Sequence, residues 1–525
     1  WQNYINTSSG GAVQGSQERS AAGYVFGTLA NRGDGSYTYT FATDITNSAA
    51  NPCPAPCTDA EGKALNIGYQ PNATHRVTIQ QGNSAYPKST GVYDFVPGGA
   101  AVTRRDVVLT STCNQCHGEV TMRGTTRVDT RLCVTCHNPG TWISGTPNRS
   151  LDLKVQSHRI HYKIFNSVNS TNPALPNFLP TVLPSVFAGT AYKLGTTDFS
   201  APTFPQDMRN CTKCHDGTLS AQGDNWINQP SIAACGSCHD DVNFGVLADP
   251  VKPKAHAGGV MTDNSTCVLC HGAGRVADVA VAHNFPARLK AAAAKFKLNI
   301  IGATPTTAGS FPVITFSVTD PTNADKPYDI KTAAPFTAAA STLTVKLGWT
   351  ATGIADIGND GSGEAYGQPV SINLLGNAAV VAGATAGTYT VTSTVAIPAT
   401  QTGTLRVMMD GHPAGDVTSA GTFTDRLAVK SAFKDFSITG PVAARRVVVD
   451  IAKCQVCHDV LSMPGNNRSD EPGVCAVCHN PNATDGGQRP ATAGVLTGGA
   501  DGKLEESIDW KVMSHAIHAG EAGKG

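Results

Sequence analysis

Apolar and polar positions alternate in two separate stretches of the chain, the pattern of antiparallel β-strands. In the first stretch, residues 37–41 follow a Gly-Asp-Gly turn, and residues 76–80 repeat the alternation. In the second stretch the same period of two occurs in four segments separated by Gly, Pro, Asp and Asn, at residues 313–318, 343–347, 389–397 and 405–409. This spacing predicts antiparallel β domains and leaves open whether they are sandwiches or small barrels.

The regions outside these stretches contain a pentad, Cys-x-x-Cys-His, that occurs seven times and uses 14 of the 16 cysteines. The spacing is typical of covalent haem c, because two thiols reach the two vinyl groups of a porphyrin while the adjacent imidazole ligates the iron. Zinc knuckles and thioredoxin-like pairs share the cysteine spacing but do not explain the trailing histidine. We therefore predict seven covalent haem c groups. The cysteines are Cys113, Cys116, Cys133, Cys136, Cys211, Cys214, Cys235, Cys238, Cys267, Cys270, Cys454, Cys457, Cys475 and Cys478, and the iron-ligating histidines are His117, His137, His215, His239, His271, His458 and His479.

The uneven distribution of the pentads divides the chain into four predicted domains. Residues 1–103 and 286–444 form β domains, residues 104–285 hold five pentads, and residues 445–525 hold two. The predicted fold is thus multidomain, with two antiparallel β domains alternating with two loop-rich, partly helical multihaem domains. A composition of 54 Gly and 31 Pro with only 6% aromatic residues suits such domains, because porphyrins would supply much of the apolar surface.

The two haem domains repeat each other. Arg104-Arg105 precedes the first pentad by the same distance as Arg445-Arg446 precedes the sixth, and in both domains the next pentad continues as Cys-His-Asn-Pro. A segment Lys-Val-x-Ser-His-x-Ile-His then follows in each, at residues 154–161 and 511–518. The second haem domain is therefore a copy of the first half of the first.

The histidine inventory nearly matches bis-histidine ligation. Seven proximal and seven distal imidazoles would use 14 of the 15 histidines. Two pairs have i,i+3 spacing, which on a helix places both rings on one face. His75 lies in a predicted strand, where it would either join the first β domain to the haem domain or serve as a structural strand residue. The expected distal ligands are His75, His158, His161, His256 and His283 for five haems and His515 and His518 for two, which leaves His412 over.

Net charge and the two remaining cysteines bear on location and partners. The formal charge is zero at pH 7, which gives no indication of a nucleic-acid partner. Cys53 and Cys57 lie in a proline-stiffened loop and are predicted to form a disulfide, with a redox switch as the alternative. Haem c is attached outside the cytoplasmic membrane, so we expect an exported protein. No run of 18 apolar residues exists, so no transmembrane segment is predicted.

Several motifs of this chain resemble the OmcA/MtrC family of outer-membrane decahaem cytochromes. They are the Arg-Arg pairs, the Cys-His-Asn-Pro pentads, the Lys-Val-x-Ser-His-x-Ile-His segments and Thr74-His75-Arg76-Val77. The resemblance covers the whole chain. It implies a cell-surface protein that conducts electrons from a porin-cytochrome conduit, or from other multihaem cytochromes, to ferric minerals, electrodes or flavins. The family has five haems in each haem domain and further strands before Trp1. We therefore expect the chain to be a portion of a longer decahaem protein, or a heptahaem variant if it is complete.

Three functions follow as hypotheses. The first is an electron-transfer protein in which the distal histidines occupy the sixth iron position and exclude small ligands, with terminal metal reductase activity left open as its one enzymatic role. The second is a multihaem oxidoreductase of the nitrite or hydroxylamine type with one open haem, although no pentad ends in Lys and the histidine count leaves no evident vacancy. The third is a subunit of a conducting cytochrome filament.

Overall fold

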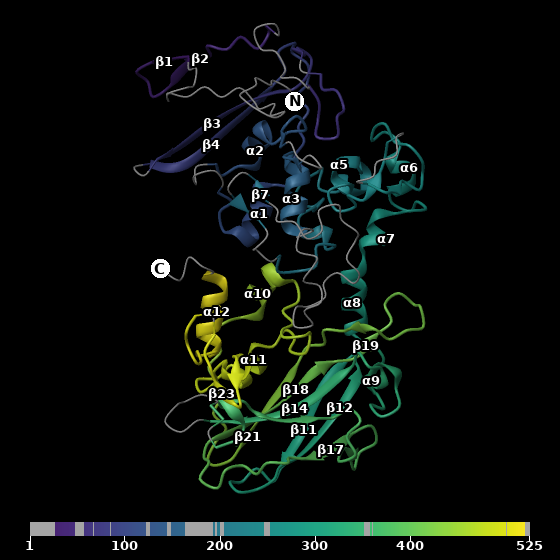
Figure 1. The fold of residues 1–525 in the computed structure, drawn as a ribbon, viewed down its shortest axis with the longest axis vertical. Helices are drawn as coiled ribbons and strands as arrows, with labels where there is room; N and C mark the ends of the chain where they lie inside the picture. The colour runs from purple at the N-terminus through teal and green to yellow at the C-terminus, as the bar shows by residue number, and fades with distance from the viewer. Residues whose placement is uncertain are drawn as a thin grey trace. The chain divides into compact units, whose positions relative to one another are not determined.

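The structure, a computed structural model, describes residues 27–47, 57–66, 68–83, 86–121, 127–143, 149–162, 193–194, 197–199, 204–245, 252–350, 358–359, 361–499 and 501–519 (Figure 1). These residues fall into two compact units that divide between His283 and Asn284. Each unit combines β-strands with pentad-bearing helices, as the alternation in the sequence predicted. The finer division into four domains stays a prediction.

Two β-hairpins make up the β-rich part of the first unit. Strand β1 (Thr28–Asn31) pairs with β2 (Tyr37–Thr40), and β3 (His75–Asn83) pairs with β4 (Tyr86–Phe95), both antiparallel. Both predicted strands are confirmed, in β2 and β3. Gly33 and Gly35 have positive φ in the turn before β2, a conformation that favours glycine. Each hairpin is a separate two-stranded sheet, so the described residues of this part form no closed barrel.

Short helices carry the pentads of the first unit. Asp129 caps one of them, α2, by accepting the Arg131 amide at 2.8 Å. The helices are α1 (Thr110–His117), α2 (Thr130–Cys136), α3 (Leu153–Tyr162), η2 (Cys211–Lys213), α4 (Asn225–Asn228), α5 (Ile232–Cys235), α6 (Cys267–His271) and α7 (Val279–His283). Between them lie the two-residue strands β5 (Trp142–Ile143), β6 (Arg149–Ser150), β7 (Lys193–Leu194), β8 (Thr197–Asp198), β9 (Val242–Asn243) and β10 (Lys254–Ala255).

The second unit contains a two-sheet β-sandwich, which decides between the sandwich and the barrel left open by the sequence. One sheet has the order β11-β12-β17-β16 with β13 paired to β12, and the other has the order β15-β14-β18-β21. Side chains of both sheets, among them Phe316 of β12 and Leu343 of β14, are fully buried in one core. The strands are β11 (Lys297–Thr304), β12 (Val313–Asp320), β13 (Lys326–Pro327), β14 (Thr342–Trp349), β15 (Val370–Asn373), β16 (Val381–Ala382), β17 (Tyr389–Thr392), β18 (Thr404–His412) and β21 (Ala432–Ser437).

The strand predicted at residues 389–397 is shorter than expected. Strand β17 ends at Thr392, because the hydroxyl of the next residue, Ser393, donates to the carbonyl of Val395 at 2.6 Å and turns the chain. Ile397 is still fully buried, which explains the apolar pattern beyond the strand.

Helices carry the two pentads of the second unit as well. Helix α11 lies against the sandwich, where Met408 of β18 packs against Val474 and Val477. Among the described residues, no helix is long and apolar enough to cross a membrane. The remaining elements are α8 (Phe285–Ala293), α9 (Ala334–Thr337), η3 (Ala365–Gly367), β19 (Ala414–Gly415), β20 (Asp425–Arg426), α10 (Ile451–His458), α11 (Pro472–Cys478), η4 (Gly486–Gln488), β22 (Ala491–Thr492), β23 (Val495–Leu496) and α12 (Trp510–Ala519).

Candidate haem-binding site

Five of the seven pentad histidines face a second histidine, and in each case it is one of the predicted distal ligands. Two metal–nitrogen bonds of ~2.0–2.1 Å, with ~1 Å from each nitrogen to its ring centre, would place the two ring centres about 6 Å apart. The observed separations match this value, so each pair fits one iron between its rings. The centre-to-centre distances are 6.1 Å for His117 and His161, 6.0 Å for His158 and His215, 6.2 Å for His239 and His283, 6.1 Å for His256 and His271, and 6.1 Å for His458 and His518.

Hydrogen bonds at the other ring nitrogen orient many of these imidazoles. His161, His283 and His518 each have Nδ1 within 2.8 Å of the carbonyl one turn earlier in their own helix. His137 and His479 have Nδ1 at 3.0 Å from the carbonyls of Leu151 and Ile508. An Nδ1–H that donates to a carbonyl leaves Nε2 with a free lone pair, the arrangement of metal-ligating histidines. The donor set therefore suits iron ligation through Nε2.

Burial favours the neutral form of the His215 imidazole. It lowers the pKa of His215 to about 4, and the neighbouring His158 adds to this effect. A neutral imidazole is the form that binds a metal. Burial also raises the pKa of the free Cys133 thiol to about 11 and that of the free Cys475 thiol to about 12, which applies before the thiols are converted to thioethers by haem attachment. Across the described ranges, no three or more His, Cys, Asp or Glu side chains gather as a site for a single metal ion.

His75, the first residue of β3, is the predicted distal ligand that comes from a β domain. It is 4% exposed, and its Nδ1 lies 2.9 Å from the Ala73 carbonyl. Its Nε2 is buried and has no hydrogen-bond partner within the described part of the chain. A buried imidazole nitrogen without a partner is costly unless a ligand satisfies it. His75 and His137 are the two histidines of this unit that lie outside the four ring pairs.

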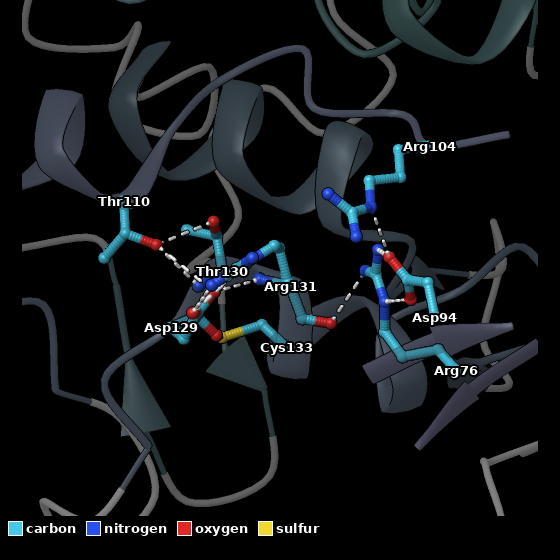
Figure 2. A network of polar contacts seen from close by, with 8 residues as sticks. All are labelled: Arg76, Asp94, Arg104, Thr110, Asp129, Thr130, Arg131 and Cys133. Carbon is cyan, nitrogen blue, oxygen red and sulfur yellow. Dashed lines mark hydrogen bonds and ion pairs between the residues drawn. The ribbon is translucent and has the colours of Figure 1, made fainter. Parts of the chain in front are cut away.

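An arginine clamp attaches β3 to the helix that carries the second pentad, and Figure 2 shows its side chains. The Arg76 guanidinium bonds both oxygens of Asp94 on β4, at 2.6 and 2.9 Å, and its Nη1 donates to the Arg131 carbonyl at 3.1 Å. Arg131 lies two residues before Cys133. The hydrogen bond from Arg76 lowers the pKa of Asp94, and the exposed Arg104 approaches the same carboxylate at 3.3 Å. The clamp thereby fixes the strand of His75 beside α2.

The second unit contains the same clamp. Arg406 on β18 bonds both oxygens of Asp435 on β21 at 2.7 Å, and its Nη1 donates to the Gly473 carbonyl at 3.0 Å. Gly473 lies two residues before Cys475, as Arg131 lies two before Cys133. The β domains are therefore duplicated together with the haem domains.

This duplication of the β domains was missed from the sequence, although a short signal exists. Thr74-His75-Arg76-Val77 corresponds to Thr404-Leu405-Arg406-Val407, and the acidic partners Asp94 and Asp435 each lie ten residues before an Arg-Arg pair. With so few shared positions and a different spacing between the two strands, only the matching hydrogen bonds make the correspondence plain. Leu405 occupies the position of His75.

The two predicted distal ligands on α12 differ in their surroundings. His518 faces His458. His515 is exposed, and among the described residues no imidazole faces it. The ring of His479 lies 6.1 Å from that of Trp510 instead. The structure therefore does not bring His515 and His479 together, and a role for His515 as a ligand stays a prediction.

A buried charged cluster lies next to the seventh pentad. Asp410 accepts hydrogen bonds from Lys346 at 2.9 Å and from Arg468 at 2.7 Å, and it also accepts one from the Thr344 hydroxyl. The burial that raises the pKa of Cys478 is opposed by the positive charges of Arg468 and Lys346. Two cations against one carboxylate leave a net positive charge close to Cys478.

Two further predicted residues lie away from these pairs. His412 is 2% exposed, and its Nδ1 lies 3.2 Å from the Thr342 hydroxyl, so it is a structural histidine of β18. Cys57 is disulfide-bonded. Cys53 lies outside the described residues, so the pairing of these two cysteines stays a prediction.

Comparisons with known proteins match the two regions of the chain that contain the pentads. Residues 105–284 and 446–524 match the family model "Outer membrane cytochrome MtrC/MtrF-like, domains II/IV". The multiheme cytochrome MtrC of Shewanella baltica (strain OS185) is 24% identical over 305 residues, which are 56% of this chain and 36% of that protein. The chain thus spans little more than a third of this relative's length.

A solved structure shares the fold. The crystal structure of the outer membrane decaheme cytochrome OmcA superposes with a TM-score of 0.57 at 19% identity, covering 86% of this chain and 63% of that one. Three findings lead to one conclusion. They are the haem c pentads, the alternation of β-rich and helical domains, and the matches to MtrC/MtrF-like domains. The chain belongs to the OmcA/MtrC family of outer-membrane multihaem cytochromes.

Proposed function

We propose that this protein transfers electrons at the cell surface through seven covalently attached haem c groups. The observation that carries the proposal is the set of five histidine pairs with ring centres 6.0–6.2 Å apart. When bound, each haem supplies an iron that cycles between the ferric and ferrous states. A second imidazole at the sixth position would keep exogenous ligands off that iron, which suits electron transfer and disfavours substrate chemistry.

His75 and His137 are proposed as the sixth pair. The support is the partnerless, buried Nε2 of His75 and the bond from Arg76 to the Arg131 carbonyl, which attaches the strand of His75 to the helix of Cys133 and Cys136. In this arrangement the first β domain completes a haem site of the first haem domain. Six of the seven pentad histidines then have a histidine partner.

Family membership supports the proposed location and partners. A member of an outer-membrane cytochrome family would receive electrons from a porin-cytochrome conduit or another multihaem cytochrome and deliver them to ferric minerals, an electrode or flavins.

Haem count and electron transfer can be measured on the same purified holoprotein. Pyridine haemochrome analysis and intact mass should give seven haems per chain. The reduced protein mixed with ferric oxide or flavin should reoxidise rapidly and without a lag. A Cys454→Ala, Cys457→Ala variant should lose one haem, and a Cys53→Ala, Cys57→Ala variant should keep all seven. Fewer than seven haems in the unaltered chain, or a reduced protein that no extracellular acceptor reoxidises, would refute the proposal.

A further inference from the structure

The two arginine clamps place Leu405 of the second unit where His75 lies in the first. In both units the clamp arginine pairs across two antiparallel strands with an aspartate and reaches the carbonyl two residues before a pentad. The residue before the arginine faces a phenylalanine on the neighbouring strand in both cases, Phe95 opposite His75 and Phe436 opposite Leu405. A leucine side chain has no lone pair to offer a metal, so the position that holds a candidate ligand in the first unit holds none in the second.

His515 does not replace the missing ligand. Helix α12 corresponds to α3, and His518 faces His458 as His161 faces His117. By the same correspondence His515 matches His158, which faces the histidine of a third pentad, His215, and not that of the second pentad. His515 therefore lies on the part of its helix that belongs to a different site from that of His479.

His412 does not replace it either. His412 lies seven residues beyond Leu405 on the same strand, about 23 Å away at ~3.3 Å per residue. Its ring is buried beside Thr342. All 15 histidines lie within the described residues. None of them takes the place of His75 beside the pentad of Cys475, Cys478 and His479.

We propose that this seventh pentad site is where the protein binds an exogenous ligand on iron, and that the ligand is a small anion. The inference rests on the proposed function in two respects, the attachment of a haem at Cys475 and Cys478 and the pairing of His75 with His137. The anionic preference follows from the cluster of Lys346, Arg468 and Asp410, which has two cations against one carboxylate. The cluster lies close to the pentad, because Met408, the strand partner of Lys346, packs against Cys478. Five of the other six sites hold two facing histidines, and the sixth holds the proposed pair of His75 and His137, so these six would exclude such ligands.

Ligand stoichiometry on the holoprotein tests the proposal. Cyanide titration of the ferric protein, followed in the Soret band, should end at one cyanide per seven haems, and the same chain should show one high-spin ferric haem by EPR before cyanide is added. His75→Ala should raise the count to two. His515→Ala and the control His412→Gln should leave it at one.

Lys346→Met should weaken cyanide binding about tenfold and leave carbon monoxide binding to the reduced protein unchanged.

The location of the site has its own test. Cys475→Ala with Cys478→Ala removes the proposed site and should abolish cyanide binding, whereas Cys454→Ala with Cys457→Ala should not. An unaltered protein that is wholly low-spin and binds no cyanide would overturn the inference, and a gain of one site in His515→Ala would then identify His515 as the ligand. Unchanged cyanide affinity in Lys346→Met would overturn the anionic preference. If seven haems are present and reoxidise normally in those cases, the proposed function stands and only this inference fails.

Discussion

The Arg406 guanidinium holds both carboxylate oxygens of Asp435 across β18 and β21, and its remaining nitrogen bonds the backbone of the helix that carries the seventh pentad. Arg406 also lies 3.9 Å above the ring of Phe433. A single buried side chain thus joins the sandwich to the haem-binding segment. Because Arg76 does the same in the first unit, the clamp is a repeated structural device of this chain.

Removing Asp435 should destabilise the second unit strongly. Asp435→Ala leaves the buried Arg406 without its carboxylate, and breaking a buried ion pair costs about 3–5 kcal/mol. Urea unfolding of the holoprotein should report this loss. Lys297→Ala is the matched control, because Lys297 pairs with Asp325 at the surface, 3.7 Å away, and loss of an exposed pair costs only about 0–1 kcal/mol. Equal losses in the two variants would contradict a structural role for the clamp.

The paired histidines on α3 and α12 should respond differently to substitution. His158→Ala and His161→Ala each remove one ring of a facing pair, so each should convert one low-spin haem to high spin. His518→Ala should do the same, whereas His515→Ala should not, because His515 has no facing imidazole among the described residues. The axial high-spin signal in the ferric EPR spectrum measures this. A low-spin spectrum in His161→Ala would show that the ring pair does not hold iron.

The charged cluster on β14 and β18 should tolerate loss of its lysine better than loss of its aspartate. Burial lowers the pKa of Lys346, which shows that its charged form is held at a cost. Asp410→Ala leaves Lys346 and Arg468 without their shared carboxylate and should lower the free energy of unfolding by about 3–5 kcal/mol. Lys346→Met keeps the Arg468 pair and the volume, and should change stability by less than about 1 kcal/mol. Chemical denaturation measures the free energy of unfolding of both variants. A larger loss of stability in Lys346→Met than in Asp410→Ala would contradict the prediction.

His412 should make stability depend on pH. Burial, reinforced by Arg426, lowers the pKa of His412 from its ordinary value of 6.5. As the pH falls through about 6.5 the unfolded chain takes up a proton that the folded chain does not, so stability declines below that pH and is unaffected above it. Denaturation between pH 5 and pH 8 should therefore show a smaller decline in His412→Gln than in the unaltered protein. Identical pH profiles would mean that this ring does not titrate on unfolding.

Local patterns in the sequence were enough for several features. The strands around residues 76–80 and 405–409 follow from a period of two. Both cysteines of five pentads lie on one short helix, where residues three apart are about one turn from each other. The helix at 154–161 places His158 and His161 three residues apart, and in the structure both face pentad histidines, while their role as iron ligands stays a prediction. The choice between sandwich and barrel could not be made, because it depends on which strands end a sheet without closing it.

The sequence by itself determined which residues can hold haem and how many pentads there are, since thiol and imidazole spacing within five residues is local covalent chemistry. It also showed the repeat of the haem domains, because the shared motifs occur at equal spacings in both domains. Only the tertiary structure decided which histidines face each other, such as His158 with His215, and that Leu405 stands where His75 does. Those relationships depend on how helices and strands that are distant in the sequence pack together. Packing is decided by the simultaneous burial of many side chains, so no short pattern of residues predicts it.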